Sequence, residues 1–469
     1  MFRGSWIVCL STLLAIVLNP GCNRTEDVYY TKALELQKRI LTLDSHVDIP
    51  WNYATEEIDP GVENEKLQVD LVKMARGGLD AVFLIAFASQ GPLTLDGYHM
   101  AHLQVIKNLQ AIHRLCKEMH PEMIGLALSP DEVRQIHASG RKIAMIGLEN
   151  GYPIATDLSR VGKFYELGVR YITLCHIGHN DICDSANRAK GYRNEELKLD
   201  KAGKRLLGAL YRMDLFSPEP PEPIHDGLSE FGKKAVAKMN RLGIMVDVSH
   251  ASSKTLLDAV EVSRAPVIAS HSCCRALCNI SRNIDDEGLR AIAESGGCVQ
   301  ITTVAGYVKY PDQQRQAIEG LIEKLGLREM GHEGLTRLYA EDPDAYQELL
   351  ERGRMEFRQI AGGSFAPPDV SDLVDHIDHA VEVIGIDHVG LGSDFEGGGG
   401  VKDFNSAADA PAITAELLRR GYSEQDIEKI WGGNLLRVWE QVEQVARQIE
   451  DEKKAAKKKL KKRFRITIE

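Results

Sequence analysis

Near the start of the chain stands the stretch Thr42–Leu43–Asp44–Ser45–His46–Val47–Asp48, a strand-like run that ends in residues able to bind a metal or a proton. Four later runs end in the same way: Ile146–Gly147–Leu148–Glu149, Val246–Asp247–Val248–Ser249–His250, Val267–Ile268–Ala269–Ser270–His271 and Leu391–Gly392–Ser393–Asp394. A parallel β/α barrel brings the C-terminal ends of its strands to one face, so residues about 350 positions apart can share one site. The pattern therefore predicts a barrel with a single polar site on that face.

Eight segments have the composition of buried parallel strands, being short and almost continuously apolar. They are Ile40–Val47, Ala81–Ala88, Lys142–Leu148, Arg170–Cys175, Ile244–Ser249, Pro266–Ser270, Cys298–Thr303 and His388–Gly392. Helical patterns separate them, at Tyr98–Met119, Pro130–Ala138, Ser229–Leu242, Ser253–Val262, Asp285–Glu294 and Val370–Ile384. Alternating strands and helices indicate an α/β fold with a parallel sheet, and eight strands favour a closed (β/α)8 TIM-type barrel. A doubly wound sheet is the weaker alternative, because it needs a Gly-rich loop after an early strand and Gly397–Gly400 comes too late.

Two stretches are interpreted as additions to the barrel. Gly191–Ile224 is polar and is expected to be a surface loop over the catalytic face. Tyr307–Pro368 is rich in Glu, Arg and Gln and is expected to form an inserted helical hairpin. Pro411–Leu418 and Ser423–Val445 are expected to close the fold as two helices. One barrel domain therefore covers residues 23–445, with an insertion at about 307–368.

Composition and charge limit the function. The 469 residues are 43% hydrophobic and 27% charged, as in an ordinary globular protein, and the net charge of −11 argues against nucleic acid as a partner of the body. Apart from Cys9 and Cys22 there are seven cysteines, whose odd number and irregular spacing do not indicate a disulfide framework. The oligomeric state is left open, a homodimer included.

The first 22 residues have the features of a processing signal. Arg3 supplies a positive charge, and the apolar stretch Trp6–Leu18 is too short for an ordinary membrane span. A small residue followed by Cys22 resembles a bacterial lipoprotein signal, in which this cysteine is lipidated and attaches the protein to a membrane. A cleaved signal for soluble export and an uncleaved anchor remain alternatives, because Asn19 stands where an apolar residue is usual. All three predict an exported protein of the bacterial cell envelope.

The C-terminal segment 446–469 carries nine basic residues between Lys453 and Arg465. A solvated, frayed helix is one interpretation. Attraction to an anionic membrane surface is the other, and it would complement lipidation of Cys22.

The residues at the strand ends have the chemistry of a binuclear metal site. His46, Asp48 and one oxygen of Glu149 can hold a first ion, while the other oxygen of Glu149, His250 and His271 can hold a second. Mixed nitrogen and oxygen ligands favour zinc, with manganese or iron as alternatives. A carboxylate that bridges two ions about 3.5–4 Å apart is how a binuclear hydrolase holds a shared hydroxide.

Asp394 ends the last strand and is not needed as a further ligand. It is suited to act as the general base that orients the bridging water and passes its proton to the leaving amine. The predicted enzyme is therefore a metal-dependent hydrolase.

The chain resembles the membrane (renal-type) dipeptidase family of zinc peptidases, relatives of the amidohydrolase barrels. The matching segments, in order, are Asp44–Trp51, Ile146–Gly151, Leu167–His176, Gly227–Gly232, Met239–His250, Arg264–Ser272, Ser281–Asn283, Gly392–Gly397 and Asn434–Val438. The resemblance places the metal ligands on the five residues named above. It places substrate contacts on His176, Arg282 and Asp394.

The resemblance also implies roles for these residues. His176 would stabilise the oxyanion, Arg282 would bind the C-terminal carboxylate of a dipeptide, and Trp51 would pack beside the metals or in the core. His179 is a near neighbour of His176 and an alternative for its role. Tolerance of a C-terminal D-residue is implied as well, and some members of the family open β-lactam rings.

Two other functions are alternatives to a dipeptidase. The first is an amidohydrolase that acts on another amide or a lactone, which an Arg282→Ala variant would distinguish by its unchanged affinity for neutral substrates. The second is a non-catalytic envelope-binding protein, which is disfavoured because no ligand or base is missing.

Overall fold

The computed structural model describes residues 27–187, 216–362 and 366–466. Its centre is a parallel barrel with the strand order β1-β2-β4-β5-β6-β7-β8-β9, and β3 pairs with β4 off this path. The strands are β1 Leu43–Val47, β2 Ala81–Phe87, β3 Ile124–Leu126, β4 Lys142–Glu149, β5 Val169–Thr173, β6 Met245–Asp247, β7 Val267–Ser272, β8 Cys298–Ile301 and β9 Val389–Leu391. The predicted (β/α)8 TIM-type fold is confirmed, and all eight predicted strands are present. Only the short β3 was not expected.

The strands are apolar on both faces because one face fills the barrel and the other packs against helices. In β2 and β4, every residue is buried except Phe87 and Lys142 at opposite ends of the two strands. β4 ends in Glu149, which is itself buried. A carboxylate in such a place needs partners, because burying an unpaired charge is costly.

The barrel closes between its first and last strands. The N–H of Asp394 donates to the carbonyl of His46 at 2.9 Å, and the N–H of Asp48 donates to the carbonyl of Phe395 at 2.9 Å. This seam lies at the C-terminal ends of β1 and β9. It brings together residues of the predicted site that stand about 350 positions apart in the chain.

The opposite end of the barrel is covered by the final helix, α17 (Asn434–Ile466). Leu435, Val438 and Trp439 are buried in one apolar cluster with residues of the barrel strands. The rings of Trp439 and Phe83 in β2 lie 5.9 Å apart. The start of α17 therefore seals the face of the barrel that lies away from the strand ends carrying the predicted ligands.

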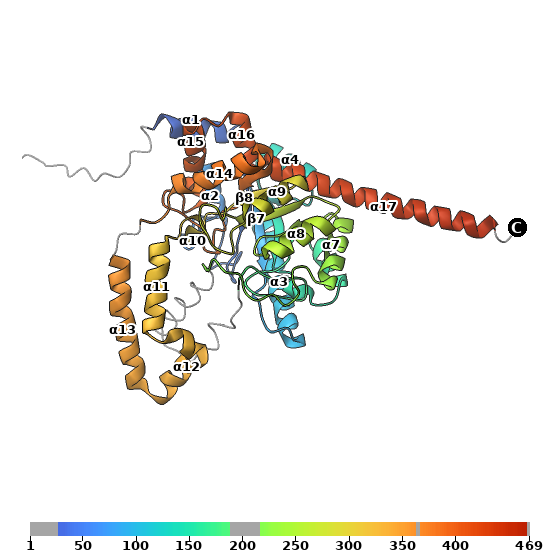
Figure 1. Ribbon diagram of the computed structural model, residues 1–469. Coiled ribbons are helices and arrows are strands. Elements are labelled where there is room, and N and C mark those ends of the chain that lie inside the picture. The colour runs from blue at the N-terminus through green and yellow to red at the C-terminus, as the bar shows by residue number, and fades with distance from the viewer. Residues whose placement is uncertain (1–26, 188–215, 363–365, 467–469) are drawn as a thin grey trace, which may run out of the picture.

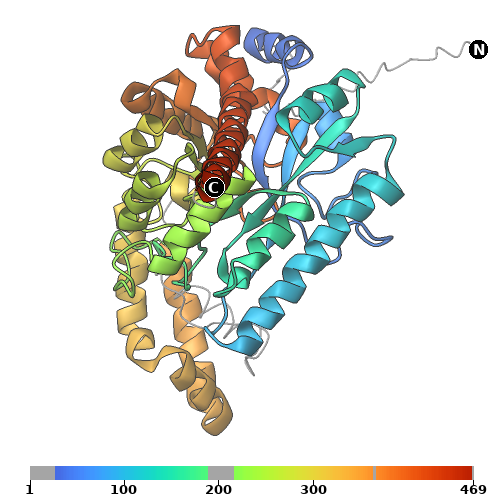
Figure 2. The same ribbon diagram turned by 90° about the vertical axis from the view of Figure 1, so that its right-hand side faces the viewer.

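Helices surround the barrel (Figures 1 and 2). They are α1 Val28–Gln37, α2 Leu71–Gly77, α3 Leu95–Arg114, α4 Pro130–Ala138, α5 Ser159–Glu166, α7 Glu230–Leu242, α8 Ser253–Val262, α9 Asp286–Glu294, α14 Val370–Ile384, α15 Pro411–Arg419 and α16 Glu424–Glu428. Single helical turns lie at η2 Leu115–Met119, η3 Tyr152–Ile154, η4 Ile386–His388, η5 Ala407–Asp409 and η6 Lys429–Gly433. The six predicted helices are present; α1, α2 and α5 were not expected.

The insertion after β8 is helical, as predicted, but it is not a hairpin. After the short α10 (Ala305–Val308) it contains α11 Asp312–Lys324, α12 Leu327–Glu341 and α13 Pro343–Gly362. Gly326 separates α11 from α12 in a left-handed conformation, with φ of 63°. Glycine adopts this conformation without steric cost, so it ends one helix and starts another, and the segment contains three helices where the prediction had two.

The C-terminal end of the chain differs from the expectation. The predicted closing helix Ser423–Val445 is divided into α16, η6 and α17, with a kink at Gly432, and α17 continues through most of the basic segment.

Two predicted segments cannot be compared with the structure. The predicted signal at residues 1–22 and most of the loop Gly191–Ile224 lie outside the described residues. Across the described ranges, no helix is both long enough and apolar enough to cross a bilayer.

Candidate metal centre

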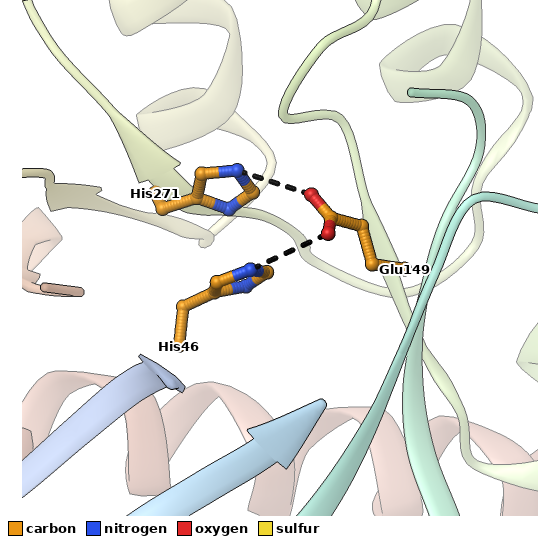
Figure 3. Close-up of side chains that lie close together, drawn as sticks. All are labelled: His46, Glu149 and His271. Carbon is orange, nitrogen blue, oxygen red and sulfur yellow. Dashed lines mark ion pairs between the residues drawn. The ribbon is translucent and has the colours of Figure 1, made fainter. Parts of the chain in front are cut away.

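Glu149 is the centre of the site. Its Oε1 lies 3.2 Å from Nε2 of His250 and 3.3 Å from Nε2 of His271, and its Oε2 lies 3.7 Å from Nε2 of His46. Figure 3 shows His271 and His46 facing different oxygens of the same carboxylate. His176 completes the surroundings, with Nε2 3.9 Å from Oε1. The strand ends β1, β4 and β7 thus converge as predicted.

A second group of ligand atoms also includes His46. His46, Asp48 and Asp394 each offer an atom within 4.8 Å of the others, and Oδ1 of Asp394 lies 3.9 Å from Nε2 of His46. The structure therefore brings all five predicted metal ligands and Asp394 into one cluster. His46 belongs to both parts of it.

The donor atoms fit a cation. Nε2 of His46 and Oδ1 of Asp48 are buried and have no hydrogen-bond partner among the described residues. The Nε2 atoms of His250 and His271 lie only 2.8 Å apart, beside a carboxylate oxygen. Buried polar atoms are costly without partners, and imidazole nitrogens with carboxylate oxygens are the ligands that zinc prefers. The residues present can therefore hold metal.

Burial and neighbouring charges shift the pKa values of Glu149 and Asp394 in opposite directions. Burial disfavours the charged form of Glu149, but the surrounding histidines outweigh it and hold the pKa of this carboxyl well below its usual range. Burial raises the pKa of Asp394 to about 7; Glu149 adds to this effect, whereas His46 and Arg282 oppose it. Two neighbouring carboxyls with separated pKa values are typical of a site in which one stays charged and the other exchanges a proton.

His271 is oriented by a chain of hydrogen bonds that the sequence did not indicate. Its Nδ1 lies 2.8 Å from Oγ of Ser270, and this hydroxyl donates to Oδ2 of Asp247 at 2.6 Å. Asp247 is fully buried and also accepts the N–H of Ser249 and the hydroxyl of Thr173. With Nδ1 engaged in this chain, Nε2 is left to face Glu149 and a metal.

His46 has a similar support. Its Nδ1 lies 2.8 Å from the hydroxyl of Tyr171, which in turn donates to the carbonyl of Ser45 at 3.1 Å. The Tyr171 ring fits only because residue 147 is glycine: a Cβ there would lie 2.3 Å from the ring. The tyrosine thus fixes the imidazole from inside the barrel and leaves Nε2 for the ligand.

The backbone around the site adopts uncommon conformations. His250 has a backbone φ of 65° and Asp394 has one of 60°, values that residues other than glycine rarely adopt. Gly397 lies against the carboxylates of Asp48 and Asp394, and a Cβ at this position would come within 2.2 Å of both. Strain of this kind persists where the surrounding structure holds a functional residue in place.

Comparisons with known proteins agree with this geometry. The family described as "Membrane dipeptidase (Peptidase family M19)" matches this chain over residues 30–215 and 218–453. The chain belongs to this family. Dipeptidase aclJ of Aspergillus oryzae is 30% identical over 389 residues, which cover 82% of this chain and 72% of that protein.

Solved structures share the fold. The probable dipeptidase PvdM from Pseudomonas aeruginosa has a TM-score of 0.73 and 30% identity, covering 89% of this chain and 99% of that one. A metallo peptidase from Rhodobacter sphaeroides, solved with a phosphinate mimic of the dipeptide L-Ala-D-Ala, has a TM-score of 0.60 and 22% identity over 86% of this chain and 99% of that one. Family membership confirms the predicted class of enzyme, a zinc-dependent metallo-dipeptidase.

The predicted substrate residues of this dipeptidase lie around the cluster. His176 contacts Glu149 as described, and its ring lies 4.3 Å from that of His250. Arg282 is only 2% exposed; its Nη1 donates to Ser272 Oγ at 2.8 Å and its Nη2 donates to the carbonyl of His271 at 2.7 Å. Its Nε is buried and has no partner in the described part of the chain.

Two other expectations have different outcomes. His179 does not reach the cluster, because its Nδ1 accepts the N–H of Ser185 at 3.1 Å and faces Asp184. The expectation that Trp51 packs in the core is wrong. It is 73% exposed and lies under the ammonium of Lys107, 4.9 Å from the ring centroid.

Proposed function

We propose that this dipeptidase holds two zinc ions that share Glu149. On one side the ligands are His46 and Asp48, and on the other they are His250 and His271. The observation that carries this proposal is that the two oxygens of Glu149 face different histidines: Oε1 faces His271 and Oε2 faces His46. A single ion would not account for both groups of donor atoms.

Asp394 is the proton carrier in this proposal. When bound, zinc supplies Lewis acidity that polarises the scissile carbonyl and lowers the pKa of a water molecule. Asp394, with its pKa raised to about 7, accepts a proton from the attacking water and transfers it to the leaving amine. Its Oδ1 lies 3.9 Å from Nε2 of His46, so the carboxyl stands beside a residue that would hold the metal.

His176 and Arg282 recognise the rest of the substrate. Burial lowers the pKa of His176, so its imidazole is neutral at physiological pH and can donate a hydrogen bond to the developing oxyanion without a full charge. Arg282 is a buried cation whose remaining N–H groups can bind the C-terminal carboxylate of the substrate. A fixed carboxylate site beside the metals would limit the enzyme to dipeptides.

The substrate class includes dipeptides with a C-terminal D-residue. The phosphinate mimic of L-Ala-D-Ala in the Rhodobacter sphaeroides structure is such a ligand for a protein of the same fold. The amidohydrolase alternative, with another amide or lactone as substrate, has no comparable support in the cluster. Its decisive difference is that it would not need Arg282.

The experiment combines metal analysis with one substitution. Purified protein is expected to contain two zinc ions per chain and to hydrolyse L,L and L,D dipeptides. Arg282→Ala should raise KM for free dipeptides by about 100-fold, the loss expected for a charge-assisted hydrogen bond pair, and should affect dipeptide amides far less, because they present no carboxylate to this position. Equal losses on both substrates, or one ion per chain, would contradict the proposal.

The location of the enzyme is part of the proposal. Cys22 is lipidated and holds the protein at the bacterial cell envelope, where it acts as a monomer or a homodimer. Mass spectrometry of the mature N-terminus tests this directly. A Cys22→Ala variant should move from the membrane fraction to the soluble fraction, and an unmodified Cys22 in the wild type would refute lipidation.

A further inference from the structure

The end of α17 extends beyond the barrel. The helix begins by sealing the barrel, and Arg264 still pairs with Glu452 through two contacts of 2.8 Å. From Asp451 to Lys459 every residue is exposed. Figure 1 shows this part of the helix projecting away from the rest of the molecule, and Figure 2 shows it nearly end-on.

The projecting part carries a concentrated positive charge. After Glu452 the chain has nine basic residues and one acidic residue, Glu469, although its overall net charge is −11. The ammonium groups of Lys453 and Lys454 lie within 4.0 Å of acidic residues one turn earlier in the helix. Lys457, Lys458 and Lys459 have no acidic partner among the described residues.

Such a helix is not stabilised by its own charges. Lys453 and Lys457 stand four positions apart, as do Lys454 and Lys458, and like charges at this spacing destabilise a helix. A surface with closely spaced negative charges would remove this repulsion. The helix therefore has the properties of a binding element for a polyanion.

We propose that the basic end of α17 docks on the surface of an anionic phospholipid bilayer. Ala456, Leu460 and Phe464 stand four positions apart among the basic residues, a spacing that gives a helix one apolar stripe, as in helices that lie in the interface between lipid headgroups and acyl chains. Lysine is favoured near anionic lipid by roughly fivefold in affinity per residue. Nucleic acid is the less suitable polyanion, because its phosphates continue along the whole duplex and would repel the acidic body of the protein.

The position of α17 in the fold agrees with this partner. Its buried start seals the end of the barrel opposite the metal centre, and Figure 1 shows the rest of the helix projecting sideways from the body. Figure 1 shows α1, which follows the predicted lipidation site in the chain, on the same upper side as α15 and α16, with the insertion α11–α13 on the lower side. A bilayer at α17 would therefore lie on the side away from the metal centre and leave it open to substrate.

The test uses the full chain with Cys22→Ala, so that no acyl anchor contributes. Binding is measured by co-sedimentation with vesicles of 30% phosphatidylglycerol in phosphatidylcholine and with vesicles of phosphatidylcholine alone. We expect binding to the anionic vesicles only, weakened by salt. Replacing Lys457, Lys458 and Lys459 with Gln should reduce the affinity by about 100-fold, with dipeptide hydrolysis unchanged.

A matched variant controls for total charge. Lys66, Lys233 and Lys234 are exposed lysines on other parts of the surface, and replacing these three with Gln should leave vesicle binding within about twofold. Equal losses in the two triple variants would overturn the proposal. So would tighter binding to a double-stranded DNA fragment than to the anionic vesicles at the same ionic strength, or no binding to vesicles at all.

Discussion

The rim of the barrel, defined by the strand ends that carry His46, Glu149 and His271, differs from the helical insertion α11–α13 in the interactions that stabilise it. At the rim, ionisable side chains are buried beside one another, and hydroxyl groups hold two of them: Ser270 holds His271 and Tyr171 holds His46. In the insertion, apolar residues from all three helices, such as Leu321, Leu335 and Tyr346, form a cluster of their own. Figure 1 shows these helices projecting from the barrel instead of lying along it.

The two regions therefore differ in how strictly their sequence is constrained. A buried charge cluster costs free energy unless ions and hydrogen bonds compensate it, so the rim is stable only in one arrangement. An apolar cluster between helices tolerates many sequences of similar volume. We therefore expect substitutions at the rim to change catalysis strongly, and changes in the insertion to change it little.

The largest effect is expected for Glu149→Gln. This substitution keeps the shape of the side chain but removes the negative charge that both parts of the cluster share, so metal binding and hydrolysis should fail together. We expect kcat/KM to fall by at least about 1000-fold, equivalent to about 4 kcal/mol, with loss of zinc measured by mass spectrometry. A Glu287→Gln variant, at an exposed position of α9, should behave as wild type. Activity within tenfold of wild type would show that Glu149 is not the shared ligand.

A smaller effect is expected for Ser270→Ala, which breaks the chain from His271 to Asp247 and leaves every metal ligand in place. Outer partners of this kind typically contribute 10–100-fold to metal affinity. We expect a loss of that size in a competition titration with a zinc chelator, and recovery of most of the activity at saturating zinc. Ser139→Ala, at the C-terminal end of α4, should not change zinc affinity. A loss of activity that added zinc does not restore would assign Ser270 another role.

The rim could be predicted because strand ends and ligands coincide in the sequence. His46, Glu149 and His271 each follow an apolar run, and a parallel barrel allows only one place where such ends meet. The supports of these residues could not be predicted in the same way. Tyr171 and Asp247 bond to residues of other strands, and such pairs depend on the register between strands, which no local pattern states. A charged residue inside an apolar strand was the available signal for Asp247.

The insertion was predicted less well for a related reason. Its helical character follows from composition, but the number of helices depended on the conformation of Gly326, a single residue among many polar ones. The exposure of Trp51 likewise depends on how the loop after β1 leaves the barrel. Loops and insertions lack the repeated neighbours that a barrel imposes on its strands.

Removal of the insertion tests the comparison directly. Its two ends lie close together, since Lys309 before α11 pairs with Asp372 in α14 at 2.7 Å. Residues 312–366 can therefore be replaced by a short Gly-Ser linker. We expect kcat on a small dipeptide to stay within about threefold and the melting temperature of the barrel to change by only a few degrees. A tenfold fall in kcat with zinc still bound would show that the insertion helps to form the site.

The smallest effect is expected at His376, which lies where the insertion joins the barrel. This residue is 1% exposed; its Nδ1 accepts the N–H of Cys274 at 3.0 Å and its Nε2 donates to the carbonyl of Val308 at 2.9 Å. Both bonds require the neutral imidazole, and burial lowers its pKa from the ordinary value of 6.5. Because the folded pKa is the lower one, the stability that neutral His376 contributes is present above about pH 6.5 and is lost as the pH falls below it.

We therefore expect the free energy of unfolding of metal-free protein, from urea titrations, to fall less steeply below pH 6.5 in His376→Gln than in wild type. The difference in slope cannot exceed about 1.4 kcal/mol per pH unit, the value for one proton. A His99→Gln variant, at an exposed position of α3, controls for the removal of an imidazole. Parallel slopes for wild type and His376→Gln would mean that His376 takes up a proton in the folded state as readily as in the unfolded chain. The junction between insertion and barrel would then accept a buried, protonated imidazole without a neighbouring carboxylate, whereas the histidines of the rim lie beside Glu149.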